Sequence, residues 1–539
     1  MHILPNLESF IHFTGIGGIG MSGLAEILHN KGFLIKGSDL VENSNIRRLK
    51  EIGIPICQGH SSTNIRGAYA LVISSAVPDD NPEVVAAREA RIPIITRGEM
   101  LAEVVRLKKT VAISGMHGKT TTTSIIASLL NAAAFEPTII NGGIINKLQT
   151  NAKLGGGEWF VVEADESDGS FLKIPSIINV VVNIDREHMN FFQTYENVEA
   201  HFRQFIHNVP FYGVSVVCSD DETVRKIIEQ GVDRRVITYG LTGSPDVRGT
   251  NVRVVGSEVA WSACGGSQAT KDSNIPSSQK NCGQETRSTG EELYSTYCSS
   301  KATDRRTNKL SGTGYKGIVF DAVIETKWLR SSTPKIIKDI FLPMFGSHNV
   351  LNALAGVAVS LELEIDEAVI KDALANFSGV KRRFSFLGNV NGVVFIDDYA
   401  HHPAEIKAVI EAAKQAGPER IVVVFQPHRY TRFADLWDRF ALELSEADIV
   451  IAMPVYTAGE QEISGIDSSS FVRAFNSKYG GSGACMAYYV ADVAELTKLL
   501  KEILKIETRA ETQKTCEFVI GMGAGSISEY MHNVYDSLR

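Results

Sequence analysis

The chain of 539 residues is long enough for about three domains of ordinary size, and its 44% hydrophobic and 22% charged residues are typical of a globular protein. A net charge of −8 argues against general nucleic-acid binding, and seven scattered cysteines without a C-x-x-C pair argue against a zinc site or a disulfide framework. Because we find neither a signal peptide nor an apolar run long enough to span a membrane, we expect a soluble, cytoplasmic protein.

The chain begins with the pattern of a nucleotide-binding strand and helix. A strand predicted at 10–14 runs into the loop Gly15-x-Gly17-x-x-Gly20, and apolar residues at helical spacing follow. A second strand, predicted at 33–37, is followed by Asp39. This order of strand, glycine loop, helix, strand and acidic residue suits a diphosphate with an attached ribose.

Two further strands complete the first predicted domain. The strand at 69–74 ends in Ser74 and Ser75, and a shorter strand is predicted at 93–96. Hydroxyls at the carboxyl end of a strand lie where open α/β sheets bind ligands, although these serines suit helix capping equally well. We therefore predict a small α/β nucleotide-binding domain over residues 1–108.

The next unit opens with a phosphate-binding loop. An apolar strand at 111–113 precedes Gly115-Met116-His117-Gly118-Lys119-Thr120-Thr121, and a helix follows. Glycines allow backbone N–H groups to face phosphate oxygens, and the helix N-terminus adds the positive end of its dipole. Lys119 has the reach for the β- and γ-phosphates, and the Thr120 hydroxyl suits Mg²⁺. The loop is two residues shorter than G-x-x-x-x-G-K-[ST], so its glycine spacing is unusual.

Acidic residues follow two strands that belong to the same predicted sheet. The strand at 159–162 runs into Glu163, the first of four acids in six residues, and we select Glu163 as the metal-binding acid. The strand at 177–184 is followed by His188, which suits a second Mg²⁺ or the γ-phosphate. The alternatives are a solvated acidic loop and a structural histidine.

Residues 262–312 differ in character from the rest of the chain. About a third of them are Ser or Thr, and large aliphatic residues are scarce. Such a segment buries too little apolar surface to offset the entropy of ordering it, so we predict a mostly disordered insertion. Domain-like sequence resumes with a strand at 317–324, and a helix beginning near 347 carries Asn349 and Asn352. These amides suit a purine edge or a helix cap.

A third unit, from residue 379, repeats the alternation of strands and helices. Strands are predicted at 393–396, 421–425, 449–453 and 517–520. Polar clusters follow the first two of these strands, which indicates a functional edge on a largely parallel, helix-covered sheet. Arg429 and Arg432, three residues apart, suit a carboxylate clamp, and the basic run at 381–383 suits phosphate or carboxylate.

Two phosphate-binding signatures in consecutive domains indicate one nucleotide carried as a handle and another used as the energy source. The third domain then binds a small acceptor. Phosphoryl transfer to a substrate carboxylate gives an acyl phosphate, which an amine held nearby displaces to form an amide. Positioning and electrostatic stabilisation supply most of the rate in such a scheme.

The sequence resembles the Mur ligases, which build the peptide of bacterial cell-wall precursors. The resemblance covers nearly the whole chain outside 262–312, and it rests on five motifs: GMHGKTTT at 115–122, EADESD at 163–168, NID-x-EHM at 183–189, HN-x-x-NA at 348–353 and DDYAHHP at 397–403. Within the family, GIGGIGMSGLA at 15–25 and QPHRY-x-R at 426–432 favour the alanine-adding branch.

The resemblance implies three α/β domains: a Rossmann-like UDP-sugar domain at 1–108, a P-loop-type ATP domain at 109–378 and a Rossmann-like C-terminal domain at 379–539. It implies an ATP-dependent amide ligase that joins L-alanine to UDP-N-acetylmuramate through an acyl phosphate, with Mg²⁺, as a monomer or homodimer. A ligase that recycles a whole peptide onto the same sugar nucleotide is the near alternative. A nicotinamide-dependent dehydrogenase and a non-catalytic regulator are more distant ones.

The resemblance also assigns roles to individual residues. The UDP-sugar would meet Gly15, Gly17, Gly18, Gly20, Asp39, Ser74 and Ser75. ATP would meet Gly115, Met116, His117, Gly118, Lys119, Thr120, Thr121, Asn349, Asn352 and Asp397 (or Asp398). Mg²⁺ would meet Thr120, Glu163 and His188. The amino-acid end would be shaped by Tyr399, His401, Arg429 and Arg432, Arg383 would approach the acyl phosphate, and His401 is our candidate for deprotonating the amine. Two residues depart mildly from the family pattern, Glu187 and Asn190.

Overall fold

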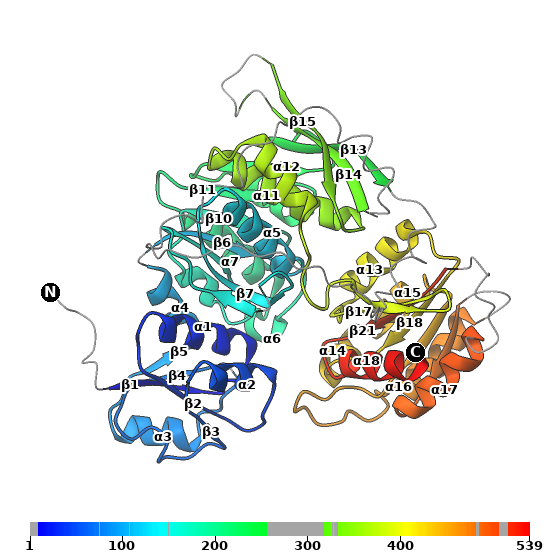
Figure 1. Ribbon diagram of the computed structural model, residues 1–539, viewed down its shortest axis with the longest axis horizontal. Helices are drawn as coiled ribbons and strands as arrows, with labels where there is room; N and C mark the ends of the chain where they lie inside the picture. The colour runs from blue at the N-terminus through cyan, green and yellow to red at the C-terminus, as the bar shows by residue number, and fades with distance from the viewer. Residues whose placement is uncertain are drawn as a thin grey trace, which may run out of the picture.

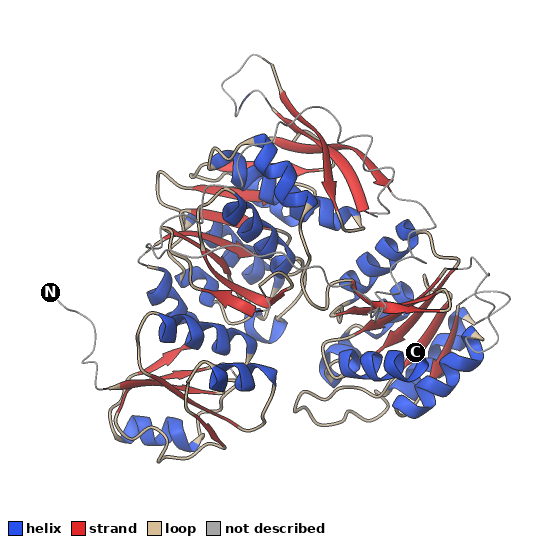
Figure 2. Ribbon diagram, viewed as in Figure 1, coloured by secondary structure: helices blue, strands red, loops and turns tan. Residues whose placement is uncertain are grey.

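The computed structural model describes residues 9–74, 76–106, 108–148, 150–255, 317–325, 327, 333–480, 485–505 and 516–539. Ser75 and the predicted insertion at 262–312 lie outside the described residues. Three separate sheets follow one another along the chain, and Figure 2 shows that helices flank each of them. The predicted α/β class with three sheet-containing parts is confirmed. No helix in the described ranges has the length and apolar character needed to cross a bilayer.

The N-terminal sheet is five-stranded and parallel, in the order β3-β2-β1-β4-β5. Its strands are β1 Phe10–Thr14, β2 Ile35–Asp39, β3 Ile56–Gln58, β4 Ala68–Ile73 and β5 Ile94–Thr96. Its helices are α1 Ile19–Asn30, α2 Ser44–Glu51, α3 Pro82–Glu89 and α4 Arg97–Val105. The strand order reverses beside β1, so the glycine loop after β1 lies at the point where doubly wound sheets bind ligands.

The middle sheet has ten strands in the order β15-β14-β13-β12-β11-β10-β6-β9-β7-β8. Its strands are β6 Lys109–Ser114, β7 Thr138–Ile145, β8 Thr150–Lys153, β9 Trp159–Glu163, β10 Ile178–Val181, β11 Val214–Cys218, β12 Val236–Gly240, β13 Val247–Val255, β14 Gly317–Ile324 and β15 Lys335–Leu342. Its helices are α5 Lys119–Ala132, η1 Ser170–Lys173 (a 3₁₀ turn), α6 Met189–Phe192, α7 Tyr195–His207, α8 Glu222–Glu229, α11 Ser347–Glu362 and α12 Glu367–Ala375. The central strands β6 and β10 are buried at every position except Lys109, as is typical of strands with helices on both faces of the sheet.

The C-terminal sheet has six strands in the order β16-β17-β21-β18-β19-β20, and only the β16–β17 pair is antiparallel. Its strands are β16 Ser385–Val390, β17 Val393–Asp398, β18 Arg420–Phe425, β19 Ile449–Ala452, β20 Met486–Tyr489 and β21 Glu517–Met522. Its helices are α13 Pro403–Ala416, α14 Tyr430–Asp435, α15 Trp437–Leu444, α16 Ser468–Tyr479, α17 Val493–Leu504 and α18 Ile527–Leu538. The predicted largely parallel sheet is confirmed.

The strands predicted from apolar runs are all present, with ends that shift by at most three residues. Strand β2 extends to Asp39 because its backbone pairs with β3 through Gln58. Periodicity did not predict β3, β7, β8, β11 to β13, β15, β16 and β20. Strand β7 contains Asn141, Gly142 and Gly143, and β20 is only four residues long, so neither carries a clear apolar pattern.

The three parts meet at the end of the middle sheet that carries the phosphate loop. In Figure 1 the N-terminal part lies below the middle part, and the C-terminal part lies beside both. Arg48 of α2 joins the first two parts, because its guanidinium donates to Asn151 Oδ1 at 3.0 Å and pairs with Glu26 at 3.0 Å. Asn151 in turn donates to the carbonyl of Ile19 at 2.7 Å. The glycine loop is thereby held against the edge of the middle sheet.

Candidate active site

The phosphate loop connects β6 to α5, and its backbone conformation depends on glycine. Gly118, the residue before α5, has φ +82°, in the region that disfavours L side chains. A Cβ at this position would lie 2.9 Å from the side-chain oxygen of Asn352, on α11. The loop therefore packs tightly under α11, and the N–H groups of Met116 and His117 donate to the backbone carbonyl and the side-chain oxygen of Asn183 at 3.3 and 2.8 Å.

Lys119 begins α5, and its ammonium folds back into the loop. Its Nζ donates to the carbonyls of Gly115 at 2.6 Å and Met116 at 3.3 Å, and to Glu166 Oε1 at 2.7 Å. Burial alone would lower the pKa of Lys119, but the neighbouring carboxylates of Glu166 and Glu163 outweigh it and raise the pKa. The ammonium is therefore charged, and it lies inside the phosphate loop.

The acids after β9 surround this ammonium. Glu163 Oε2 accepts from the backbone N–H of Gly142 at 2.6 Å, and burial raises the pKa of its carboxyl. Glu166 is fully buried, with Oε1 3.4 Å from His188 Nε2 and Oε2 without a hydrogen-bond partner in the described part of the chain. A hydroxyl at Thr120, a carboxylate at Glu163 and a nearby buried carboxylate oxygen form an oxygen-rich set of the kind that Mg²⁺ prefers.

One cavity of about 840 Å³ lies where the three parts meet. Residues from all three parts line it. They include Gly20, Asn43, Asn45 and Arg97 from the first, Lys119, Thr120, Glu163 and His188 from the second, and Lys381, Arg383, Tyr399, His401, Glu405 and Arg432 from the third. The first part contributes a glycine loop, the second a charged phosphate loop and the third cations and imidazoles. The cavity is thus equipped for two anionic groups and an acceptor.

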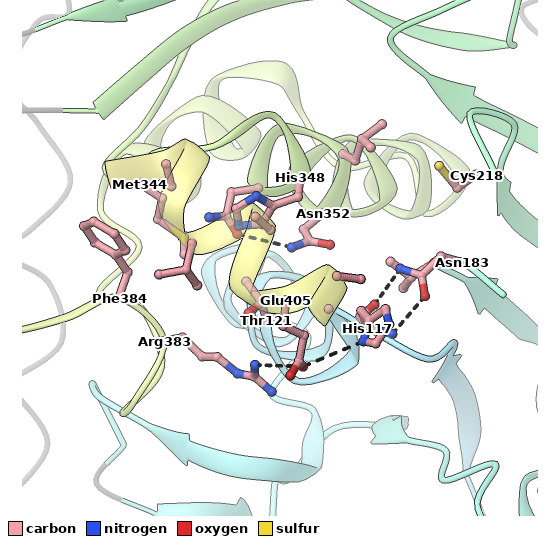
Figure 3. Close-up of a pocket in the computed structure, with 18 of the residues that line it drawn as sticks. His117, Thr121, Asn183, Cys218, Met344, His348, Asn352, Arg383, Phe384 and Glu405 are labelled. Carbon is pink, nitrogen blue, oxygen red and sulfur yellow. Dashed lines mark hydrogen bonds and ion pairs between the residues drawn. The ribbon is translucent and has the colours of Figure 1, made fainter. Parts of the chain in front are cut away.

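A second cavity, of about 340 Å³, lies behind the phosphate loop between the middle and C-terminal parts (Figure 3). Asn349 and Asn352 line it and bond to each other, with Asn352 Nδ2 3.2 Å from Asn349 Oδ1. Thr122 donates to Asn352 Oδ1 at 3.0 Å. Burial lowers the pKa of His348 to about 4, so this imidazole is neutral. Both apolar and polar side chains line this cavity beside the phosphate loop, and such a lining suits the flat base of a nucleotide.

Imidazoles and arginines of the C-terminal part lie next to each other at the larger cavity. His401 Nδ1 lies 2.9 Å from the carbonyl of Tyr399, and burial lowers the pKa of its ring. His428 lies edge-on to His401 with ring centroids 5.9 Å apart, and it stacks on Tyr456 at 5.4 Å. Burial lowers the pKa of His428 to about 3, and Arg432 lies 3.4 Å from its Nδ1. The wall of the cavity therefore presents the neutral ring of His401 beside the guanidinium of Arg432, and His428 packs behind them.

Family comparisons match all three parts of the chain. The description "Mur ligase family, catalytic domain" matches residues 10–109, "Mur ligase middle domain" matches 113–279, and "Mur ligase, glutamate ligase domain" matches 382–509. The chain belongs to the Mur ligase family.

Individual relatives agree with this assignment. A UDP-N-acetylmuramate–L-alanine ligase from Granulibacter bethesdensis is 42% identical to this Mur ligase over 100% of the chain and 96% of the relative. The crystal structure of a UDP-N-acetylmuramate–alanine ligase from Thermotoga maritima matches with a TM-score of 0.70 at 26% identity, covering 98% of each chain. A murein peptide ligase from Psychrobacter arcticus has the same fold, with a TM-score of 0.62 at 18% identity over 98% of each chain. The resemblance that the motifs indicated is confirmed.

The glycine loop of this Mur ligase brings several predicted sugar-nucleotide residues together. The N–H of Gly17 donates to Asp39 Oδ2 at 2.8 Å, and a Cβ at Gly15 would lie 3.6 Å from the hydroxyl of Ser74. Asn43 and Asn45 both donate to the carbonyl of Gly17, at 3.2 and 2.9 Å. Asp39 therefore holds the loop itself, and Gly20 reaches the larger cavity.

Two predicted residues of the C-terminal part lie outside both cavities, as do Gly15, Gly17, Gly18, Asp39 and Ser74 of the first part. Asp397 accepts a hydrogen bond from Ser528 at 2.6 Å and lines neither of the two cavities described above, whereas Asp398 lines the smaller one. Adjacent residues of β17 face opposite sides of the sheet, so only one of the two carboxylates can face the phosphate loop. Arg429 precedes α14 with φ +70° and lies outside the lining of both cavities, whereas Arg432 lines the larger one.

Sequence reasoning passed over several residues of the site: Asn43, Asn45, Arg97, Glu166 and Glu405. Glu166 lies in the acidic motif, but Glu163 was preferred because it is nearer the strand. Glu405 follows His402-Pro403 at the third position of α13, which is a helix-start pattern with an acidic residue. That pattern signals a helix cap, and nothing in it indicates a contact with another domain.

Proposed function

We propose that this Mur ligase joins L-alanine to the carboxylate of UDP-N-acetylmuramate, with ATP converted to ADP and phosphate, in peptidoglycan precursor synthesis. The observation that supports this best is the convergence of three parts at one cavity, with Gly20, Lys119 and His401 in its lining. Relatives that are 41–43% identical over at least 98% of the chain carry the name of that activity. The roles assigned below to single residues belong to the same proposal.

The first step is phosphoryl transfer to the sugar carboxylate. The phosphate loop and Lys119 hold the polyphosphate of ATP, and Asn349 and Asn352 lie at the adenine side. A carboxylate oxygen of the sugar attacks the γ-phosphorus, the bond to the β-phosphate oxygen breaks, and ADP leaves with the electron pair. Arg383, in the lining of both cavities, stabilises the charge of the acyl phosphate.

The second step forms the amide. The alanine ammonium loses one proton to a base, its nitrogen forms a bond to the acyl carbon, and the bond from that carbon to the phosphate oxygen breaks. The departing phosphate takes the second nitrogen proton. Arg432 pairs with the alanine carboxylate, and the neutral rings of His401 and His428 border the amine.

Thr120, Glu163 and His188 fit a divalent cation by their chemistry and by their common position in the larger cavity. Bound there, Mg²⁺ neutralises charge on the polyphosphate. The chain's own part is to hold these ligands, with Glu163 fixed by the N–H of Gly142.

The test is phosphate release from ATP and Mg²⁺ with UDP-N-acetylmuramate, with and without L-alanine, for the unaltered protein, Lys119→Ala and Lys226→Ala. Lys226 is the matched control because its exposed ammonium pairs with Glu199 and lies outside the lining of both cavities. Release should need both substrates, fall at least 100-fold in Lys119→Ala and persist in Lys226→Ala. Release that needs a tripeptide instead of alanine would favour the recycling ligase, and release without either would contradict the proposal.

A further inference from the structure

Glu405 lies at the boundary between the two cavities and lines both of them. Its side chain is 10% exposed. Oε2 accepts from the backbone N–H of His401 at 3.0 Å and lies 3.3 Å from His401 Nδ1. Oε1 lies 3.4 Å from Arg383 Nη1 and 3.8 Å from His117 Nδ1, as Figure 3 shows for these last two partners. One buried carboxylate thus faces three potentially cationic groups.

The contacts of His401 determine which ring nitrogen carries its proton. Nδ1 lies 2.9 Å from the carbonyl oxygen of Tyr399, which can only accept a hydrogen bond. Glu405 Oε2 lies on the same side of the ring. Both neighbours therefore require a proton on Nδ1, and the lone pair of the neutral ring is on Nε2. Within the described residues Nε2 has no hydrogen-bond partner, and His401 lines the larger cavity.

We propose that Glu405 is a positioning residue that holds His401 with Nδ1 protonated and Nε2 free to accept the proton of the incoming amine. This rests on the proposed ligase function and deepens it, because it names the group that orients the base. A buried carboxylate at the Nδ1 side fixes the tautomer of an imidazole and stabilises the imidazolium that forms when Nε2 takes a proton. In this role Glu405 acts through the ring of His401.

Other charged groups also face His401. Arg432 on α14 opposes a positive charge on the ring, whereas Glu187, from the loop before α6, favours it together with Glu405. Arg383 and His117 share the carboxylate of Glu405. A variant at Glu405 can therefore act through His401, through Arg383 or through the phosphate loop, and the experiment has to separate these routes.

These routes are distinguished by measuring the formation of the acyl phosphate and the formation of the amide separately. Hydroxylamine is already a neutral nucleophile, so hydroxamate formation from ATP and UDP-N-acetylmuramate reports the acyl phosphate without the need for a base. In Glu405→Gln, hydroxamate formation should stay within about 3-fold of the unaltered protein, while kcat with L-alanine falls 10- to 100-fold. Glu405→Asp should recover part of that loss. Glu411→Gln, an exposed carboxylate on the same helix, is the control and should behave like the unaltered protein.

The pH profile supplies a second readout. Removal of the Glu405 charge should move the acid limb of kcat/KM for alanine to lower pH by about one unit, because the carboxylate favours the protonated ring. The double variant Glu405→Gln/His401→Ala should lose no more alanine turnover than His401→Ala alone.

Three outcomes would overturn the inference: equal loss of hydroxamate and alanine turnover, an unchanged acid limb, or additive losses in the double variant. If the unaltered protein makes no hydroxamate and releases no phosphate with alanine, the proposed function itself fails. An active unaltered protein with a fully active Glu405→Gln rejects only the role of Glu405.

Discussion

The imidazole of His117 in the phosphate loop stacks on the imidazole of His402 at the start of α13, with ring centroids 4.8 Å apart and an angle of 29° between the rings. The contact joins the middle part to the C-terminal part. Burial lowers the pKa of His402 to about 4. Burial acts in the same direction on His117, but Asp185 and Glu405 outweigh it and raise its pKa to about 10. At neutral pH a charged ring therefore lies on a neutral one.

This pairing predicts how His117 contributes to stability as pH changes. Because the folded pKa is above the unfolded value of about 6.5, the contribution is full below pH 6.5 and is lost as pH rises toward 10. We expect His117→Ala to lower the free energy of unfolding by roughly 2 kcal/mol at pH 6 and by much less near pH 10. Urea denaturation at several pH values measures the difference, with His29→Ala as a half-exposed control. A difference that grows with pH would contradict the assignment of charge.

Alanine substitutions at Gly118 and Gly231 distinguish the effect of backbone strain from a steric effect on nucleotide binding. Gly118→Ala places a Cβ at φ +82°, 2.9 Å from Asn352 Oδ1. Gly231 has φ +91° with no atom within 4 Å of its Cβ position, so Gly231→Ala carries the same strain without the clash. Each variant should lose about 1–2 kcal/mol of stability. Only Gly118→Ala should weaken ATP binding, by at least 10-fold in calorimetric titration, and equal weakening in both variants would reject this reading.

Glu83 is the centre of a buried polar network in the N-terminal part. It is fully buried and accepts from Thr14 at 2.6 Å, Ser38 at 2.7 Å and Asn64 at 2.6 Å, with His12 Nε2 at 3.2 Å. Burial raises the pKa of the carboxyl, but these hydrogen bonds outweigh it and lower the pKa to about 2.

A lowered folded pKa means that the stability from Glu83 is present above about pH 4.5 and is lost as pH falls toward 2. Glu83→Gln should lower the free energy of unfolding by about 3 kcal/mol at pH 7, with the difference shrinking between pH 4.5 and 2. Glu89→Gln, an exposed carboxylate on the same helix α3, should change it by less than about 0.5 kcal/mol. Chemical denaturation from pH 2 to 7 tests both expectations, and a pH-independent difference would argue against the ionised network.

Arg97 lies beside the glycine loop of the N-terminal part and lines the larger cavity. It begins α4, its guanidinium packs against Gly20, and Nη2 pairs with Asp165 at 2.9 Å. We expect Arg97→Ala to raise KM for UDP-N-acetylmuramate about 10-fold and to leave KM for ATP within 2-fold, because the ion pair of Arg97 among the described residues is with Asp165 and not with the phosphate loop. Arg88→Ala, in an exposed pair with Asp79, is the control. A larger increase in KM for ATP than in KM for UDP-N-acetylmuramate would contradict a role of Arg97 in binding the sugar nucleotide.

The local sequence pattern was enough to predict many of the strands and both glycine loops of this protein. The apolar runs that became β1, β6, β9, β10, β17, β18 and β21 are visible in the sequence, because strands buried on both faces need nearly continuous apolar residues. The glycine loops after β1 and β6 are visible too, because close backbone approach to a phosphate demands glycine. Residue type and position at strand ends led to the selection of Lys119, Thr120, Glu163 and His188, and the structure brings these four residues to one cavity.

Tertiary structure alone decided which of these side chains meet. Asp397 and Asp398 are neighbours in sequence, and the pleat of β17 turns only Asp398 toward the smaller cavity. Glu405 looks like a helix-cap residue, yet its carboxylate reaches His117 of another part of the chain at 3.8 Å. Local sequence encodes propensity and periodicity, whereas contacts between residues almost 300 positions apart depend on how three separately folded sheets pack. The sequence therefore indicated the type of reaction. The packing of the three sheets determined which side chains come together in the site.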